Sequence, residues 1–186
     1  MKAKPGKNSG QVVLEVTRSD DPLLAASSPA TTSPFQIKKI LVPVDFSDCS
    51  RKALRYALAL AKEHQAAITL VHVIAPPSYP VGEFGGLEYG NLVADMRVGG
   101  EKQLKEMARN DVGNAAPVDI RILSGAPATE IVEAAKELDV DMIVISTHGH
   151  TGLKHVLLGS IAEHVVRTAP CPVLVVRERE HEILPS

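Results

Sequence analysis

Apolar segments of two kinds alternate between residues 40 and 176, and this alternation is the strongest constraint on the fold. Some are short, rich in Val, Ile and Leu, and almost continuously apolar, which is typical of strands buried on both faces of a parallel sheet. Four runs have this character: residues 40–44, 68–73, 142–145 and 173–176.

A fifth run, residues 118–123, has a different pattern. Its apolar residues alternate with Asp119 and Arg121, so one face of the strand is expected to contact water. This alternation predicts a strand near an edge of the sheet.

The segments between these strands carry helical periodicity. Ser47 suits the N-cap of one helix, and Pro127 suits the first turn of another. A further helix is weaker, because Gly99 and Gly100 lie inside it. The expected helices are residues 47–64, 93–108, 127–138 and 160–168.

Strands and helices therefore alternate as βαβαβαβαβ, which predicts an α/β fold. We expect one Rossmann-like domain with a five-stranded parallel sheet in the flavodoxin-like order 3-2-1-4-5 and helices on both faces. In this order the first and fourth strands are neighbours.

The ends of the chain differ from this core. Half of residues 1–36 are Ser, Thr, Pro, Gly or Ala, a composition that cannot bury enough surface to offset the entropy of ordering. We expect a disordered leader over residues 1–36, one α/β domain over residues 37–177, and a solvated C-terminal tail over residues 178–186.

Composition excludes several classes of function. The net charge is −2, and three Phe, three Tyr and no Trp offer few stacking platforms, so nucleic acid is not an expected partner. No apolar run approaches the roughly 20 residues of a membrane span. Cys49 and Cys171 form no CxxC pair, which indicates neither a disulfide framework nor a thiolate zinc site and favours a cytoplasmic location.

Ligands of such a sheet bind beyond the carboxyl ends of the strands, where the strand order reverses. Asp45 ends the first strand and Ser146 ends the fourth, so we expect their loops to face each other. Gly159 and Ser160 open the next helix, whose N–H groups and dipole suit a phosphate. Glycine in a turn and Gly-Ser at a helix start are also ordinary capping chemistry, and spacing alone leaves both interpretations open.

Histidines offer weaker candidates. His148, His150 and His155 suggest a metal, but their loop has no carboxylate or thiolate partner, which favours solvated or phosphate-facing rings. His72 lies inside an apolar strand and is interpreted as a core or rim residue with a hydrogen-bonded ring nitrogen. The chain has no P-loop motif and no GxGxxG motif after a strand, and it shows no Ser-His-Asp or Cys-His set. Enzyme activity is therefore not indicated and is left open.

Several motifs together resemble the universal stress protein family. They are residues 39–47 (KILVPVDFS), residues 69–73 (TLVHV), residues 125–127 (GAP) and residues 146–176. The ATP-binding branch of that family carries Gly, two residues, Gly, nine residues, then Gly-Ser or Gly-Thr. Here Gly149, Gly159 and Ser160 match that spacing, whereas Ser146 stands where the family usually has Gly.

The resemblance implies a stress-response protein that binds ATP or AMP, with Mg²⁺ accompanying the phosphates. With so few aromatic residues, adenine is expected to lie between aliphatic side chains such as Val44 and Val73. The candidate nucleotide-binding residues are Pro43, Val44, Asp45, Val73, Ser146, His148, Gly149, His150, Gly159, Ser160 and Ile161.

The last strand is a candidate dimer interface. The family typically pairs two copies through this strand, and Val173, Leu174, Val175 and Val176 leave it apolar at every position. An exposed edge of this kind promotes aggregation unless another strand covers it, so a two-fold partner is expected.

Two other functions remain compatible with the sequence. One is a slow ATP hydrolase or phosphotransferase, for which only His148 and His150 could orient a water molecule or nucleophile. The other is a nucleotide-independent dimeric scaffold in which Ser146 marks a lost site.

Overall fold

A computed structural model describes residues 2–5, 12–15, 36–75, 86–147 and 158–178. The chain divides into two units, residues 1–36 and 37–186. In the first, β1 (Lys2–Pro5) pairs antiparallel with β2 (Val12–Glu15). The composition of residues 1–36 did not indicate this pairing.

The second unit is built on five parallel strands. They are β3 (Lys39–Pro43), β4 (Ala67–Ile74), β5 (Val118–Ser124), β6 (Met142–Ser146) and β7 (Val173–Val176). Their order is β5-β4-β3-β6-β7, and every neighbouring pair is parallel. This is the order 3-2-1-4-5, so the predicted sheet is confirmed.

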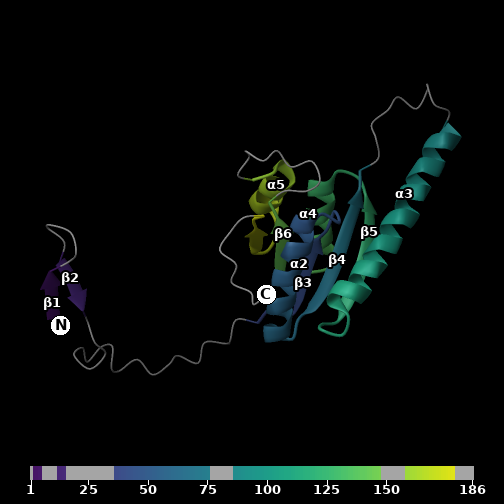
Figure 1. The fold of residues 1–186 in the computed structure, drawn as a ribbon. Helices are drawn as coiled ribbons and strands as arrows, with labels where there is room; N and C mark the ends of the chain where they lie inside the picture. Colours follow the sequence, from purple (N-terminus) through teal and green to yellow (C-terminus); the bar gives the residue numbers. More distant parts are fainter. Residues whose placement is uncertain (1, 6–11, 16–35, 76–85, 148–157, 179–186) are drawn as a thin grey trace. The chain divides into compact units, whose positions relative to one another are not determined.

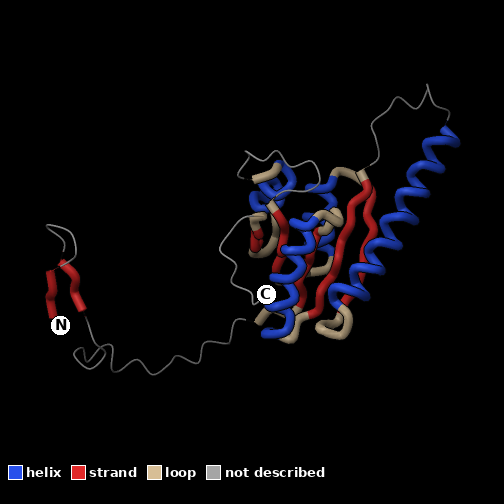
Figure 2. Tube along the Cα trace, viewed as in Figure 1, coloured by secondary structure: helices blue, strands red, loops and turns tan. Residues whose placement is uncertain are grey.

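Helices cover both faces of this sheet, and the two-residue period of the strands divides the core (Figures 1 and 2). Ile40 and Val42 of β3, with Val44 directly after it, belong to a buried cluster with α2 (Asp48–His64) and α3 (Gly86–Met107). Leu41 belongs to the opposite cluster, with α4 (Pro127–Glu137) and α5 (Ser160–Thr168).

Three of the four helices begin and end close to where they were expected. Ser47 caps α2, Pro127 lies in the first turn of α4, and α5 covers residues 160–168 as predicted. The predicted start of α3 at residue 93 was wrong: the helix begins at Gly86 and passes through Gly99 and Gly100 without a break.

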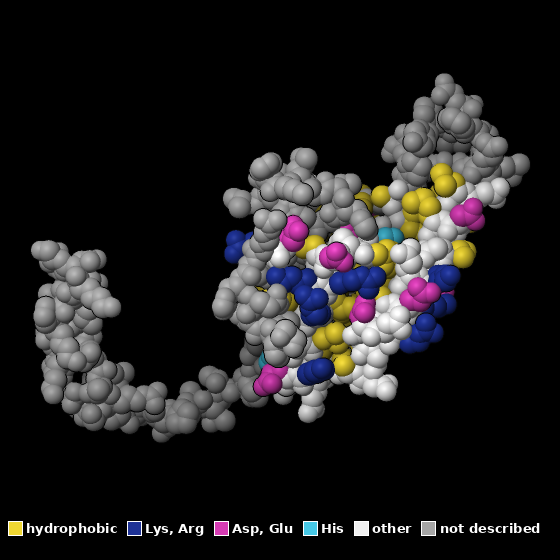
Figure 3. All heavy atoms as spheres, in the orientation of Figure 1, with side chains coloured by type: hydrophobic (Ala, Val, Ile, Leu, Met, Phe, Trp, Pro, Cys, Tyr) yellow, Lys and Arg dark blue, Asp and Glu magenta, His cyan; other side chains and the backbone are white. Residues whose placement is uncertain are grey.

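The helix α3 runs into a π-helical turn, η1 (Ala108–Val112), which closes with a hydrogen bond from Gly113 N to Ala108 O of 2.9 Å. Its other end presents Leu92, Met96 and Val98, which are 44%, 37% and 68% exposed. Figure 3 shows hydrophobic side chains along this end of α3.

The two edge strands differ in their sequence pattern. β5 alternates partly buried and exposed residues along its first half, as predicted for an edge strand, whereas β7 is apolar at all of its positions.

No helix among the described residues is long and apolar enough to cross a membrane.

Candidate functional site

The end of β3 and the end of β6 lie side by side at the carboxyl edge of the sheet. Ile40 pairs with Met142 and Leu41 with Ile143, which makes these two strands direct neighbours. Asp45 follows β3, and Ser146 is the last residue of β6. The predicted adjacency of the two strand ends is therefore confirmed.

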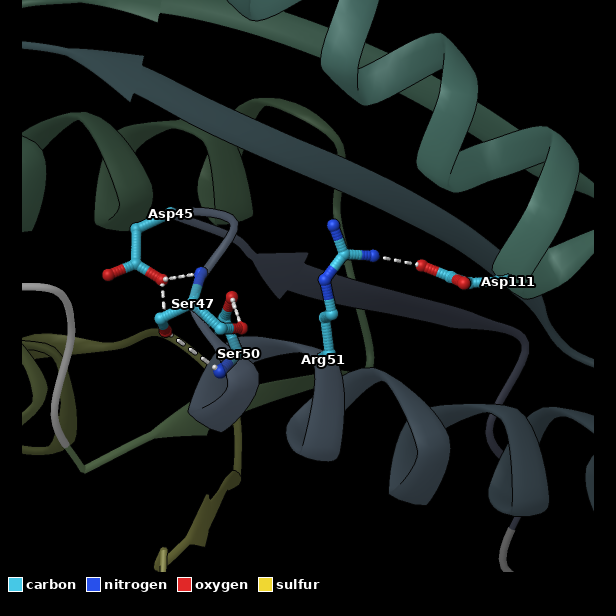
Figure 4. Close-up of polar contacts among 5 residues, drawn as sticks. All are labelled: Asp45, Ser47, Ser50, Arg51 and Asp111. Atoms are coloured by element: carbon cyan, nitrogen blue, oxygen red, sulfur yellow. Dashed lines mark hydrogen bonds and ion pairs between the residues drawn. The ribbon is translucent and has the colours of Figure 1, made fainter.

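Asp45 forms a compact turn with the start of α2 (Figure 4). Its Oδ1 accepts a hydrogen bond from Ser47 Oγ at 2.6 Å and one from Ser47 N at 3.2 Å. Ser47 Oγ in turn accepts from Ser50 N at 3.2 Å, which caps the helix. Asp45 thus supports the entry into α2, and the same turn fixes its carboxylate at the edge of the sheet.

An ion pair secures α2 one residue further on. Arg51 Nη1 lies 2.6 Å from Asp111 Oδ2, which belongs to η1 (Figure 4). Both side chains are partly exposed, so the pair contributes roughly 0.2–1 kcal/mol to stability. Its role is to hold the first turn of α2 against the end of α3 and η1.

Gly159 lies directly against the end of β6. Thr147 N donates to Val176 O at 2.9 Å, and Gly159 N donates to Thr147 O at 2.9 Å. A Cβ at position 159 would lie 2.6 Å from Thr147 O, a distance that no side chain tolerates. Glycine is needed here because α5 begins directly against the end of β6.

The first turn of α5 has the properties of an anion site. Gly159 is its N-cap and provides no side-chain hydrogen bond. The first N–H groups of a helix have no partner within the helix, and the dipole makes this end positive. Ser160 and Ile161 are exposed in this turn. A phosphate or carboxylate is the ligand that this arrangement favours.

Three of the predicted site residues are not part of this description. His148, Gly149 and His150 lie outside the described residues. Among the residues that the structure does describe, no group of three or more His, Cys, Asp or Glu side chains is placed to hold a metal ion.

The aliphatic clamp of Val44 and Val73 remains a prediction, and the structure places the two side chains on opposite faces of the sheet. Val44 is 4% exposed and packs in the cluster with α2 and α3, whereas Val73 packs against the cluster on the α4 and α5 side. Their side chains therefore point to opposite faces of the sheet. Pro43, the last residue of β3, is buried, and as the neighbour of Val42 it points to the other face, that of Val73.

An aromatic pair at the same edge was missed. The rings of Phe46 and His72 lie 4.5 Å apart between centroids, at an angle of 40°. Val42 pairs with Leu70 and Pro43 with Val71, so a parallel register continued by one residue brings Val44 opposite His72. Knowing this register would have been enough to place His72 beside the Asp45 turn. The interpretation of His72 as a core or rim residue with a hydrogen-bonded ring nitrogen is confirmed by the contact of Nδ1 with Val44 O.

Comparisons with known proteins agree with this fold. Residues 36–177 match the model of the universal stress protein family. The universal stress protein MJ0531 of Methanocaldococcus jannaschii is 37% identical over 149 residues, which cover 78% of this chain and 85% of that protein.

Solved structures share the fold. The universal stress protein MJ0577 of Methanocaldococcus jannaschii superposes with a TM-score of 0.68 at 31% identity, covering 78% of this chain and 99% of that one. Two universal stress proteins solved as complexes, one with cAMP and one from Archaeoglobus fulgidus with dAMP, superpose with TM-scores of 0.57 and 0.53. At 23% and 22% identity these two are similar at the level of the fold. The match over residues 36–177, together with the identity to MJ0531, establishes that this chain belongs to the universal stress protein family.

Proposed function

We propose that this chain is a nucleotide-binding regulatory module of the stress response that takes ATP or AMP at the carboxyl edge of its sheet. One observation carries the proposal: the Asp45 turn and the first turn of α5 follow neighbouring strands, and hydrogen bonds fix both at that edge. A carboxylate accepts hydrogen bonds from the hydroxyl groups of a ribose. A helix N-terminus holds phosphates. The two features together match the two polar parts of a nucleotide.

The identity of the base comes from the relatives. Two proteins with this fold are described as complexes with cAMP and with dAMP, which are both adenine nucleotides. The chemistry of the described residues is compatible with this class. Val73 packs on the α4 and α5 face of the sheet and is partly exposed, so it can supply apolar surface for a base.

Mg²⁺ enters the proposal as a companion of the phosphates. The described residues hold no cluster of metal-ligating side chains, and Mg²⁺ usually retains several waters and binds phosphate oxygens. We therefore expect this chain to bind Mg²⁺ through the nucleotide and to bind it weakly alone.

The test of the nucleotide site is calorimetric titration of the full chain with Mg-ATP and Mg-AMP, after removal of endogenous nucleotide. Ser160→Asp is the informative variant. A carboxylate at the first position of α5 interacts favourably with the helix dipole, so the fold is not weakened, but the same negative charge repels a phosphate. We expect unchanged or slightly raised thermal stability, by up to about 1 kcal/mol. We also expect affinity for Mg-ATP to fall by about tenfold.

Ser160→Asn is the matched control, since it has nearly the shape of Asp and no charge. It should bind Mg-ATP within about twofold of the unmodified chain. Absence of binding by the unmodified chain at millimolar nucleotide refutes the proposed function, whereas full affinity in Ser160→Asp moves the phosphates away from α5.

We also propose that two copies associate through β7. Within the described residues β7 pairs only with β6, and its residues Val173, Leu174 and Val175 are partly exposed. The carbonyls of Pro172 and Val176 accept hydrogen bonds from the β6 side. Because N–H and C=O groups alternate in direction along a strand, those of Val173 and Val175 point to the open edge and are suited to pair with a second β7.

A proline substitution in β7 can block the association of two copies without preventing the domain from folding. Val175→Pro removes an outward N–H group and leaves the inner ladder intact, so we expect a folded monomer. Leu174→Pro removes an inward N–H group and should destabilise the domain. Sedimentation velocity measures the outcome, and a Val175→Pro chain that keeps the mass of a dimer contradicts pairing through β7.

A cytoplasmic location is also proposed. Both cysteines, Cys49 and Cys171, are free thiols. Unpaired cysteines are typical of reducing compartments.

A further inference from the structure

His72 donates a hydrogen bond to the loop that carries Asp45. Its Nδ1 lies 2.8 Å from Val44 O. A carbonyl oxygen can only accept, so Nδ1 must carry the proton. This bond links β4 to the residue directly before Asp45.

The same ring also supports the residue directly after Asp45. Phe46 has φ of 69°, in the left-handed region that a bulky side chain rarely adopts. Its ring lies 4.5 Å from the ring of His72. Such a backbone persists only where surrounding contacts hold it, and the His72 ring is one of those contacts.

On its other side His72 is bounded by α3. A Cβ at Gly100 would lie 3.1 Å from His72 Cδ2 and 3.6 Å from Nε2. Gly100 is buried at this contact. The ring therefore fills a slot between α3 and the Asp45 turn and has little room to rotate.

His72 is polar, whereas its neighbours on the same face of β4 are apolar. Ile68, Leu70 and Ile74 point to the same face of β4 and are buried apolar side chains. An aliphatic residue at position 72 would pack with them but could not donate to Val44 O. The polar contact, rather than core volume, is what a histidine supplies there.

We propose that His72 is a positioning residue for the nucleotide site: its Nδ1–H and its ring hold residues 44–46 in the conformation that presents the Asp45 carboxylate. This inference rests on the proposed nucleotide binding. If Asp45 is presented in only a fraction of molecules, the observed affinity falls by that fraction.

Two variants separate the two contacts. His72→Phe keeps an aromatic ring beside Phe46 and removes the donor to Val44 O. His72→Asn keeps an N–H donor near the position of Nδ1 and removes the ring. Ile122→Val is the matched control, because Ile122 pairs with His72 across the β4–β5 ladder and also bounds Gly100.

The measurement is the Kd for Mg-ATP, determined with and without a second change, Asp45→Ala. We expect His72→Phe to weaken binding by about tenfold and Ile122→Val by less than about twofold. In the Asp45→Ala chain, His72→Phe should add less than about twofold, because the carboxylate that it positions is absent. His72→Asn should restore part of the affinity lost in His72→Phe.

A merely structural role predicts a different pattern, in which His72→Phe weakens binding equally with and without Asp45. That result overturns the inference and leaves nucleotide binding intact, as does full affinity in His72→Phe. Absence of binding by the unmodified chain overturns both. Because His72→Phe could unfold the domain, NMR of the His72 ring provides a second measurement: protonation at Nε2 in place of Nδ1 also contradicts the inference.

Discussion

Two aspartates, one at each end of the sheet, use their carboxylates differently. At the amino end, Asp141 Oδ2 accepts hydrogen bonds from Lys38 N at 2.7 Å and Lys39 N at 2.9 Å. Those donors are more than 100 residues away along the chain. At the carboxyl end, Asp45 Oδ1 accepts from Ser47, which is two residues away.

The two aspartates therefore have different roles: Asp141 stabilises the domain, whereas the bonds of Asp45 set the direction of its own carboxylate. The Asp141 bonds join the start of β3 to the start of β6, and Lys39 Nζ adds a bond to Leu138 O at 2.9 Å. Losing them loosens two central strands. The Asp45 bonds close a local turn, so losing them changes where a carboxylate points more than whether the domain folds.

The largest expected effect on stability comes from Asp141→Ala. Two backbone N–H groups lose a charged acceptor, and we expect unfolding to become easier by about 2 kcal/mol. This corresponds to a fall in Tm of roughly 5 °C for a domain of this size. Urea and thermal denaturation measure the change, and Mg-ATP affinity should stay within about twofold. A Tm equal to that of the unmodified chain contradicts the assigned role of Asp141.

Asp45→Ala is expected to show the opposite pattern, with a small loss of stability and a large loss of affinity for Mg-ATP. The helix α2 retains its cap from Ser47, so we expect less than about 1 kcal/mol of destabilisation. Affinity for Mg-ATP should fall by about tenfold. The same pair of measurements applies, and a variant that loses stability but binds normally would make Asp45 another structural aspartate.

The smallest effect concerns Cys171. Burial raises the pKa of its thiol, and the negative charge of Asp141 raises it further. Asp141→Asn removes the repulsion, so the pKa falls and the thiolate fraction at pH 8 increases. We expect alkylation by iodoacetamide to accelerate by less than about threefold. The comparison uses a Cys49→Ser background, in which only Cys171 reacts; an unchanged or slower rate contradicts it.

The sheet was predictable because its strands are coded by continuous local patterns. β7 covers residues 173–176 as expected, and the alternation of Asp119 and Arg121 correctly placed β5 at an edge. Ser47 and Pro127 marked helix starts because capping depends on a few adjacent residues.

Other features depend on contacts between distant segments. Gly99 and Gly100 weakened the expected helix, whereas the packing of Gly100 against His72 gives that glycine a reason to lie inside α3. The turn η1 changes only the spacing of backbone hydrogen bonds, which leaves no side-chain signature.

The candidate site shows the same division. The positions of Asp45, Ser146, Gly159 and Ser160 at the carboxyl edge could be predicted because each lies at the end of a strand or the start of a helix. The opposite faces of Val44 and Val73 required knowing which face each strand end presents. The pairing of Phe46 with His72 required the register between β3 and β4.

The hydrogen bond between Gly159 N and Thr147 O also has an evolutionary consequence. A Cβ at position 159 would meet Thr147 O at 2.6 Å, so a side chain there must push the start of α5 away from the end of β6. Selection for a close junction between these two elements therefore restricts position 159 to glycine.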